Sequence, residues 1–289
     1  MFEKELETAI DAARLAGKVI LEHYALEIIA EEKLGVDNFY EPVTAADRAA
    51  SAMIVGHLSA AFPQDAVLSE EVPDNAKERL SHERAWIIDP IDGTAGFVKK
   101  DGDFGVQIGL AVRGDPVVGV VLLPFHGILY YASKGAGAFR IPGNGPAERM
   151  HVSSKTDFSK MDLAITRHHS SRNMTRVLEE FQFRRLTHRG SVGLKVGLLA
   201  EGVCDIYIHP SPRTKIWDTC GPQVILEEAG GRLTDLFGMP LDYASADLQN
   251  HNGILATNGT AHADAVKRMR PILDEFGRHP VPAKNLAAG

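Results

Sequence analysis

The chain has 289 residues, of which 44% are hydrophobic and 24% are charged, a composition typical of a globular protein with a sizeable core. A formal net charge of −7 and a pI near 5.9 argue against a protein that binds a nucleic-acid polymer or an anionic membrane surface, because both require excess positive charge. A small phosphorylated metabolite stays compatible with this charge if divalent cations reverse the local potential.

The cysteine content and the N-terminus indicate the compartment. Cys204 and Cys220 are too few for a disulfide framework, which favours a reducing environment. Glu3, Glu5 and Glu7 stand where a signal peptide would carry positive charge. No apolar run approaches the ~20 residues needed to span a bilayer. We therefore expect a cytoplasmic protein that contacts no membrane.

The first half of the chain predicts helices followed by consecutive strands. Apolar residues recur at three- and four-residue steps over roughly residues 2–30, which predicts a helix, and the polar stretch 31–42 predicts a loop. Thr44 to Asp47 has the form of a capping box, which opens a second helix that ends at Phe62. Short apolar runs predict strands at 66–68, 86–88, 106–112, 117–123, 128–132 and 138–139.

In the second half, strand-like and helical segments alternate. The turn residues at 143–146 predict a boundary between an N-terminal half, 1–145, and a C-terminal half, 146–278. Residues 279–289 have the composition of a disordered end. The whole pattern predicts a layered fold of α+β and α/β segments. Strands are predicted at 163–166, 204–208 and 254–257, and helices at 173–181, 192–201, 219–229 and 261–276.

Acidic residues stand repeatedly at the ends of predicted elements. Glu70 follows the 66–68 run, and Asp89 and Asp92 follow the 86–88 run. Asp218 opens a helix after two apolar residues, and Asp47 lies in the first turn of the second helix. Mg²⁺ requires several oxygen ligands, which carboxylates at loop-bordered strand ends can supply. These positions therefore predict a site for a hard cation.

The segment from Asp89 to Thr94 has the features of a sharp turn at such a site. Pro90 fixes a turn dihedral, and Gly93 permits the backbone to double back. Asp89 and Asp92 can then face one point, while Gly93 and Thr94 offer amides and a hydroxyl to an oxyanion.

Each acid also has an ordinary structural interpretation. Asp47 can serve as a capping-box residue, Asp218 as a helix N-cap, and Glu70 with Glu71 as a solvated pair. Such interpretations do not explain why acids follow buried strands repeatedly.

Four motifs then resemble one known superfamily. They occur in its order and spacing: Pro42-Val-Thr-Ala-Ala-Asp47, Leu68-Ser-Glu-Glu71, Trp86-Ile-Ile-Asp-Pro-Ile-Asp-Gly-Thr94, and Ile216-Trp-Asp218 through Gly230-Gly231. The superfamily contains inositol monophosphatases, fructose bisphosphatases and 3′(2′),5′-bisphosphate nucleotidases. The resemblance covers roughly residues 1–275. It implies an inositol-monophosphatase-like sugar phosphatase fold with alternating α-β-α-β-α layers.

The resemblance implies a cofactor and its ligands. Asp89 resembles the ligand that bridges two metals. Glu70 and the backbone carbonyl of Ile91 resemble the remaining ligands of one metal, and Asp92 and Asp218 those of the other. The implied cofactor is Mg²⁺, with two or three ions in each active site.

The implied reaction is phosphate-monoester hydrolysis by a metal-activated water. Thr94 and Asp47 resemble the pair that orients and activates this water. Two metals can neutralise the equatorial oxygens and stabilise the leaving oxygen of an in-line displacement. Inhibition by lithium is expected from the resemblance alone, as is a homodimer.

Within the superfamily, several segments look most like the bisphosphate nucleotidases, which hydrolyse adenosine 3′,5′-bisphosphate to AMP. Those segments are Leu68-Ser-Glu-Glu71, Thr166-Arg-His-His169, Gly190-Ser-Val-Gly-Leu-Lys195 and Trp217-Asp-Thr-Cys220. Inositol monophosphatases carry a glutamate shortly before Trp-Asp, whereas residues 206–217 contain no acid but two cations, which suits a second phosphate. The predicted substrate contacts are Gly93, Thr94, Thr166, His169, Ser191, Lys195, Arg213 and Lys215.

Alternatives remain open for individual residues and for the activity. His169 can be an ordinary surface histidine, and Lys195 can extend outward from its apolar helix. Ala95 and Gly96 match neither branch after Thr94. The second candidate activity is an inositol-1-monophosphatase or a broad-specificity sugar phosphatase. A third, from another class, is a catalytically silent sensor or scaffold that binds a phosphorylated metabolite.

Overall fold

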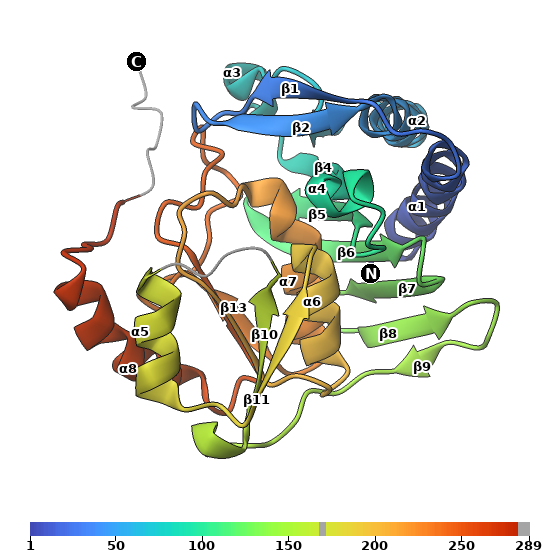
Figure 1. The fold of residues 1–289 in the computed structure, drawn as a ribbon. Helices are drawn as coiled ribbons and strands as arrows, with labels where there is room; N and C mark the ends of the chain where they lie inside the picture. Colours follow the sequence, from blue (N-terminus) through green and yellow to red (C-terminus); the bar gives the residue numbers. More distant parts are fainter. Residues whose placement is uncertain (168–171, 283–289) are drawn as a thin grey trace.

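The computed structural model describes residues 1–167 and 172–282 and contains three β-sheets with helices packed between and outside them (Figure 1). The strands are β1 (Ala30–Leu34), β2 (Tyr40–Thr44), β3 (Ala66–Ser69), β4 (Arg84–Asp92), β5 (Gly105–Val112), β6 (Asp115–Leu123), β7 (Ile128–Ser133), β8 (Gly137–Pro142), β9 (Glu148–Arg149), β10 (Asp162–Thr166), β11 (Arg185–Arg189), β12 (Ile206–His209), β13 (Arg232–Thr234) and β14 (Ile254–Thr257). The helices are α1 (Glu3–Tyr24), α2 (Ala45–Ala61), α3 (Ala76–Arg79), α4 (Thr94–Val98), α5 (Arg172–Phe181), α6 (Val192–Ala200), α7 (Cys220–Glu228), α8 (His262–Glu275) and the 3₁₀ turns η1 (Phe158–Lys160) and η2 (Ile216–Asp218).

The largest sheet has seven strands in the order β3 to β9, and it is buried on both faces. Only β3 and β4 pair in parallel; the other neighbours are antiparallel. Along β6, Val120 packs in the core beside α1 and α2, while Val121 packs in the core beside α6 and α7. Burial of both faces explains why this strand reads as an unbroken apolar run instead of an alternating one.

Glycines allow α7 to lie directly on this sheet. A Cβ placed on Gly119 of β6 would lie 2.1 Å from the carbonyl oxygen of Gly221 in α7. A Cβ on Gly109 of β5 would lie 2.5 Å from the Cys220 sulfur. Only glycine permits such close backbone approach, so these positions fix where the N-terminal end of α7 meets the sheet.

The five-stranded sheet has the order β11-β10-β12-β14-β13, and helices cover both of its faces. β10 pairs in parallel with β11 and β12, whereas β14 pairs antiparallel with β12 and β13. α5 and α8 pack on the outer face, and α6 and α7 pack on the inner face. The resulting order, α1 and α2, large sheet, α6 and α7, small sheet, α5 and α8, confirms the predicted α-β-α-β-α layers (Figure 1).

Two predictions for the N-terminal region are wrong. The first helix ends at Tyr24, not near residue 30, and the expected loop 31–42 forms most of the antiparallel hairpin of β1 and β2. Nearly all of β1 is exposed, so no alternation of apolar and polar side chains marks it as a strand. β11, β13, α3 and β9 were also not predicted, and β11 is a largely polar strand at the sheet edge.

Most other elements agree with prediction. The capping box at Thr44 and Asp47 is present, and α2 ends before Phe62. Asp218 does not open a helix directly: it closes the single turn η2, and α7 begins two residues later. α8 runs through Pro271. In the part of the chain that the structure describes, no helix has the length and apolar character needed to cross a membrane.

The predicted division into two halves stays a prediction. The boundary at 143–146 lies between β8 and β9, and β9 still pairs with β8 in the large sheet. α6 and α7, which belong to the second half, form the layer that both sheets share. Of the predicted disordered end, residues 283–289 lie outside the described residues.

Candidate metal centre and active site

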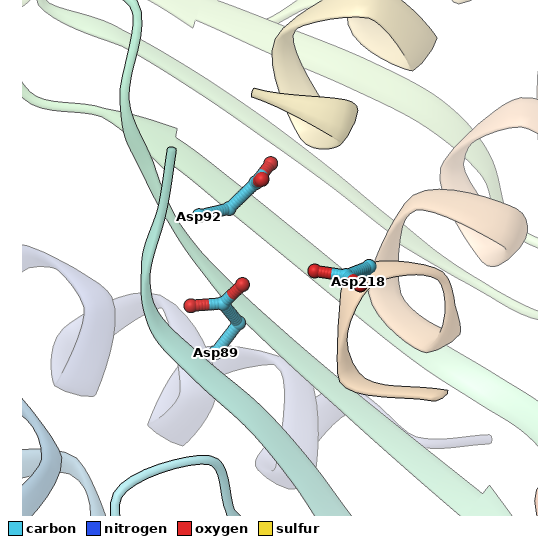
Figure 2. A group of neighbouring side chains, drawn as sticks. All are labelled: Asp89, Asp92 and Asp218. Atoms are coloured by element: carbon cyan, nitrogen blue, oxygen red, sulfur yellow. The ribbon is translucent and has the colours of Figure 1, made fainter. Parts of the chain in front are cut away.

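Three aspartates converge where β4 ends and η2 closes. Asp89 and Asp92 come from β4 and Asp218 from η2, and one carboxylate oxygen of each lies within 4.8 Å of the others. Figure 2 shows the three side chains directed into the space between the strand and the turn. The pairing of β4 with β5 is irregular between Asp89 and Asp92. Such an irregularity lets residues three apart share one face, which a regular strand does not allow.

Gly93 turns the chain immediately after this strand. Its φ of +94° lies in the left-handed region, and an added Cβ would lie 2.7 Å from the carbonyl oxygen of Asp103. A larger residue would therefore be strained and would also clash. The predicted role of glycine in the turn agrees with this geometry.

Protein donors hold one oxygen of two of these aspartates. Oδ2 of Asp92 accepts from Ser191 Oγ at 2.5 Å, from the Gly193 amide at 2.8 Å and from the Gln107 side chain. Oδ2 of Asp218 accepts from the Lys215 amide at 2.6 Å. These bonds orient both carboxylates while their other oxygens stay available to the cluster.

Asp89 has an unsatisfied oxygen. Its side chain is 1% exposed, and Oδ1 is buried with no hydrogen-bond partner among the described residues. A buried acceptor without a donor is costly, and a buried unpaired carboxylate more so. A cation at the centre of the cluster would remove this cost, so the donor set fits a divalent metal.

The electrostatics of the cluster lead to the same conclusion. Burial, with the charges of neighbouring acids including Asp92, raises the pKa of Asp89 well above its usual range. Burial raises the pKa of Asp218 to about 8, and the charge of Asp92 adds to the shift. Like charges in a poorly solvated site disfavour ionisation unless a positive charge compensates.

Glu70 lies beside the three aspartates but is paired with a lysine. It adjoins Asp89 in the same cavity, and its carboxylate lies 2.8 Å from the ammonium of Lys33 on β1. Lys33 also binds Glu71. Burial raises the pKa of Glu70 to about 7, although Lys33 opposes the shift. Glu70 thus borders the cluster and is paired with Lys33, but it is not among the three acids whose oxygens lie within 4.8 Å of one another.

Thr94 and Asp47 form a hydrogen-bonded pair beside the cluster. Thr94 Oγ1 lies 3.1 Å from Asp47 Oδ1 and 3.0 Å from the carbonyl oxygen of Ile91. Asp47 Oδ2 accepts from the amide and the hydroxyl of Thr44 at 2.8 and 2.6 Å. One oxygen of Asp47 therefore caps α2, which confirms its structural interpretation, and the other faces Thr94.

A cavity of about 230 Å³ adjoins these groups. Glu41 and Pro42 of β2 and Trp217 of η2 also line it. Pro42 and Trp217 belong to the motifs that carry the family resemblance, and Glu41 stands where many inositol monophosphatases have aspartate, but none of the three was among the predicted site residues. The hairpin that carries Glu41 was predicted as a loop. The predicted site residues that line the cavity are Glu70, Asp89, Ile91, Gly93, Thr94, Arg213, Lys215 and Asp218.

Only one of the two predicted cations in this cavity is exposed. The Arg213 side chain is 42% exposed, and its guanidinium lies 4.6 Å from the ring centroid of Phe39. The Lys215 side chain is 3% exposed, with its ammonium 3.0 Å from both Asp37 and Glu41. Lys215 therefore holds the hairpin against the site, while Arg213 retains donors for a ligand.

Three other predicted contacts, Lys195, Ser191 and Thr166, are not among the residues that line the cavity. Lys195 is 2% exposed, donates to the Gly190 carbonyl and lies 5.0 Å from the centroid of the Tyr207 ring. Burial lowers the pKa of Lys195 to about 8, against the attraction of Asp92. Ser191 binds Asp92, and Thr166 stands at the end of β10. His169 lies outside the described residues.

Comparison with known proteins agrees with this architecture. The model of the inositol monophosphatase family matches residues 1–272. The chain is 36% identical over 238 residues to the 3′(2′),5′-bisphosphate nucleotidase CysQ of Salmonella typhimurium, covering 82% of this chain and 93% of that protein. Solved structures include CysQ from Bacteroides thetaiotaomicron, with 31% identity, a TM-score of 0.75 and coverage of 89% and 98%. The Thermotoga maritima IMPase has 28% identity, a TM-score of 0.79 and coverage of 95% and 100%.

The chain therefore belongs to the inositol monophosphatase family. Membership makes it a phosphatase that acts on phosphoric monoesters, as the sequence predicted.

We expect the metal-free protein to lose stability as the pH rises from about 5 to 8.5. Unfolded carboxyls ionise near pH 4, whereas Asp218 and Glu70 ionise near 8 and 7 in the fold. A carboxyl whose pKa is higher in the folded than in the unfolded protein stabilises the fold at low pH, where it is protonated. This stabilisation disappears as the pH rises through the pKa of the folded state. Asp218→Asn removes one such group, so its melting temperature in EDTA should fall less over this range.

The control is Asp115→Asn, which changes an exposed carboxylate at the start of β6. Its melting curves should follow those of the wild type at every pH. If the melting temperatures of Asp218→Asn and of the wild type fall by the same amount as the pH rises, the fold does not raise the pKa of Asp218.

Proposed function

We propose that this chain is a Mg²⁺-dependent phosphatase that hydrolyses the 3′-phosphate of adenosine 3′,5′-bisphosphate to give AMP in the cytoplasm. The convergence of Asp89, Asp92 and Asp218 beside the Thr94–Asp47 pair is the observation that carries the proposal. The similarity to nucleotidases named CysQ supports the choice of substrate. A homodimer is part of the proposal and rests on family resemblance alone.

Five groups would hold two or three Mg²⁺ ions: the side chains of Glu70, Asp89, Asp92 and Asp218 and the carbonyl of Ile91. Carboxylate and carbonyl oxygens are the ligands that hard cations prefer. Bound Mg²⁺ supplies charge neutralisation for the phosphoryl oxygens and lowers the pKa of coordinated water.

The Thr94–Asp47 pair would orient the attacking water. The Thr94 hydroxyl donates either to Asp47 or to the Ile91 carbonyl, and both arrangements leave a lone pair on its oxygen. That lone pair accepts a hydrogen bond from water and aims the water at phosphorus. Two donors from Thr44 keep Asp47 oriented although burial raises its pKa.

Arg213 is the group we assign to the second phosphate. It lines the cavity, and its guanidinium retains exposed donors while Phe39 and Asp37 hold it in place. We assign Lys195 and Ser191 to the support of Asp92, through charge and a hydrogen bond respectively.

A monophosphate of inositol or another sugar is the second candidate substrate. Asp37 and Glu41 neutralise Lys215. The cavity is therefore less positive than expected from the presence of Arg213 and Lys215 in the sequence. The fold similarity to the Thermotoga maritima IMPase adds to this alternative.

Thr94→Ala should lower kcat by ~10²-fold while the affinity for Mg²⁺ changes little, because a lost orienting group affects the chemical step alone.

Asp89→Asn, by contrast, should lower the rate by several orders of magnitude even at saturating Mg²⁺. Phosphate release and calorimetric Mg²⁺ titration measure the two effects. If Asp89→Asn kept more than about a tenth of the rate, a loss of only ~1.4 kcal/mol, the proposed metal site would be wrong.

Arg213→Ala should lower kcat/KM for adenosine 3′,5′-bisphosphate by ~10–100-fold, the scale of one charge-assisted hydrogen bond. Hydrolysis of adenosine 3′-monophosphate, which differs only by the missing 5′-phosphate, should fall far less. Lys195→Ala should affect both substrates equally, because it acts on Asp92.

The matched control is Arg113→Ala, which removes an exposed arginine at the hairpin between β5 and β6. Equal losses on the two nucleotides in Arg213→Ala would remove Arg213 from the second-phosphate site. A wild-type preference for inositol 1-phosphate would favour the alternative substrate class.

A further inference from the structure

The chain continues beyond the part that the family model matches, and it turns back onto the segments around Pro210 and His251. The match ends at residue 272, within α8. Gly277 follows α8 with φ of +60°, the Arg278 amide bonds the Leu273 carbonyl at 2.8 Å, and the Gly277 amide bonds Asp274 at 3.0 Å. This is the Schellman end of a helix, which reverses the chain direction.

The Arg278 side chain then bridges two segments. One terminal nitrogen donates to the carbonyl of His251 at 3.0 Å, and the other donates to the carbonyl of Pro210. A second contact follows: the Val281 amide bonds Asn252 Oδ1 at 2.8 Å, and Asn252 Nδ2 bonds the Val281 carbonyl at 3.0 Å. Residues 278–282, called here the C-terminal strap, are thus tied to the rest of the protein by several hydrogen bonds.

Both segments that Arg278 joins are connected with Asp218. Pro210 begins the loop 210–218, which ends in Asp218. His251 follows residues 248–250, which are hydrogen-bonded to that loop. The Asn250 side chain donates to the Lys215 carbonyl at 2.9 Å, and the Asn250 amide donates to Thr214 at 2.8 Å. The Lys215 amide in turn donates to the Asp218 carboxylate.

A cavity of about 720 Å³, larger than the one at the metal cluster, borders this region. Ile216 and Asn250 line it, together with Pro280 and Val281 of the C-terminal strap. Ile216 is also buried in an apolar cluster with Trp217, so packing holds part of the loop. Where the cavity leaves the loop without packing, hydrogen bonds carry more of the task of holding the backbone in one position.

From this geometry we infer that Arg278 is a positioning residue for Asp218 and thereby sets the affinity of the cluster for divalent cations. The inference rests on the proposed role of Asp218 as a metal ligand. The Arg278 guanidinium fixes the distance between Pro210 and His251. Residues 248–250 transmit that constraint to the loop that ends in Asp218, because their backbone is hydrogen-bonded to the loop.

Mg²⁺ binding to the full-length, EDTA-treated protein tests the inference by calorimetry, with the metal alone and no substrate. Arg278→Ala should raise the Kd for Mg²⁺ about tenfold. Arg270→Ala, which removes an exposed arginine of α8 beside the same cavity, should stay within about twofold of wild type. Arg278→Lys should be intermediate, since an ammonium does not reproduce the two-pronged geometry of guanidinium.

A lower melting temperature for Arg278→Ala with an unchanged Kd would overturn the inference, because the C-terminal strap would then only stabilise the fold. If that variant does not fold, Asn252→Ala, which breaks the second contact, carries the same comparison. Asp218→Asn serves as the reference. If Asp218→Asn binds Mg²⁺ with the wild-type Kd, both the metal assignment and the inference are wrong. If the Kd for Mg²⁺ rises in Asp218→Asn but not in Arg278→Ala, only the role of Arg278 is wrong.

Discussion

The burial of several carboxylates close to one another is the constraint on which the rest of the site depends. Asp89, Asp92 and Asp218 lie within reach of one another in a poorly solvated space, where burial raises the pKa of all three and neighbouring charges add to the shift at Asp89 and Asp218. The fold tolerates this because donors fix Asp92 and Asp218 from outside the cluster. The unsatisfied oxygen of Asp89 then marks the point where a cation gains most.

That constraint makes the position of η2 relative to β4 decisive, and backbone contacts set it. α7 begins two residues after η2 ends, and it lies on β5 and β6 at Gly109 and Gly119, which contribute no side chain to the contact. The helix that both sheets share therefore also places Asp218 opposite Asp89. On the other side, the β1–β2 hairpin reaches Glu70 through Lys33 and the 213–218 loop through Lys215.

The sequence was sufficient for most of the buried elements, although not for β13, and for the acids of the cluster, for physical reasons. β5 and β6 are buried on both faces and so read as apolar runs, and the acids stand out because they interrupt such runs. The β1–β2 hairpin and β11 are exposed and polar, so periodicity contains no signal for them. The environment of a lysine is not local either: Lys215 meets Asp37 and Lys195 meets Tyr207 only in the folded chain.

The proton balance of metal binding tests the central claim most directly. Near pH 7, Glu70 and Asp218 are partly protonated in the metal-free protein, because their pKa values are about 7 and 8. Asp89, whose pKa burial raises well above its usual range, also holds its proton. Mg²⁺ should therefore displace more than one proton, and the calorimetric heat should change with the ionisation enthalpy of the buffer. This dependence should weaken as the pH rises above about 8, where Glu70 and Asp218 lose their protons without metal. Binding that gives the same heat in every buffer at pH 7, or no Mg²⁺ binding, would contradict the account.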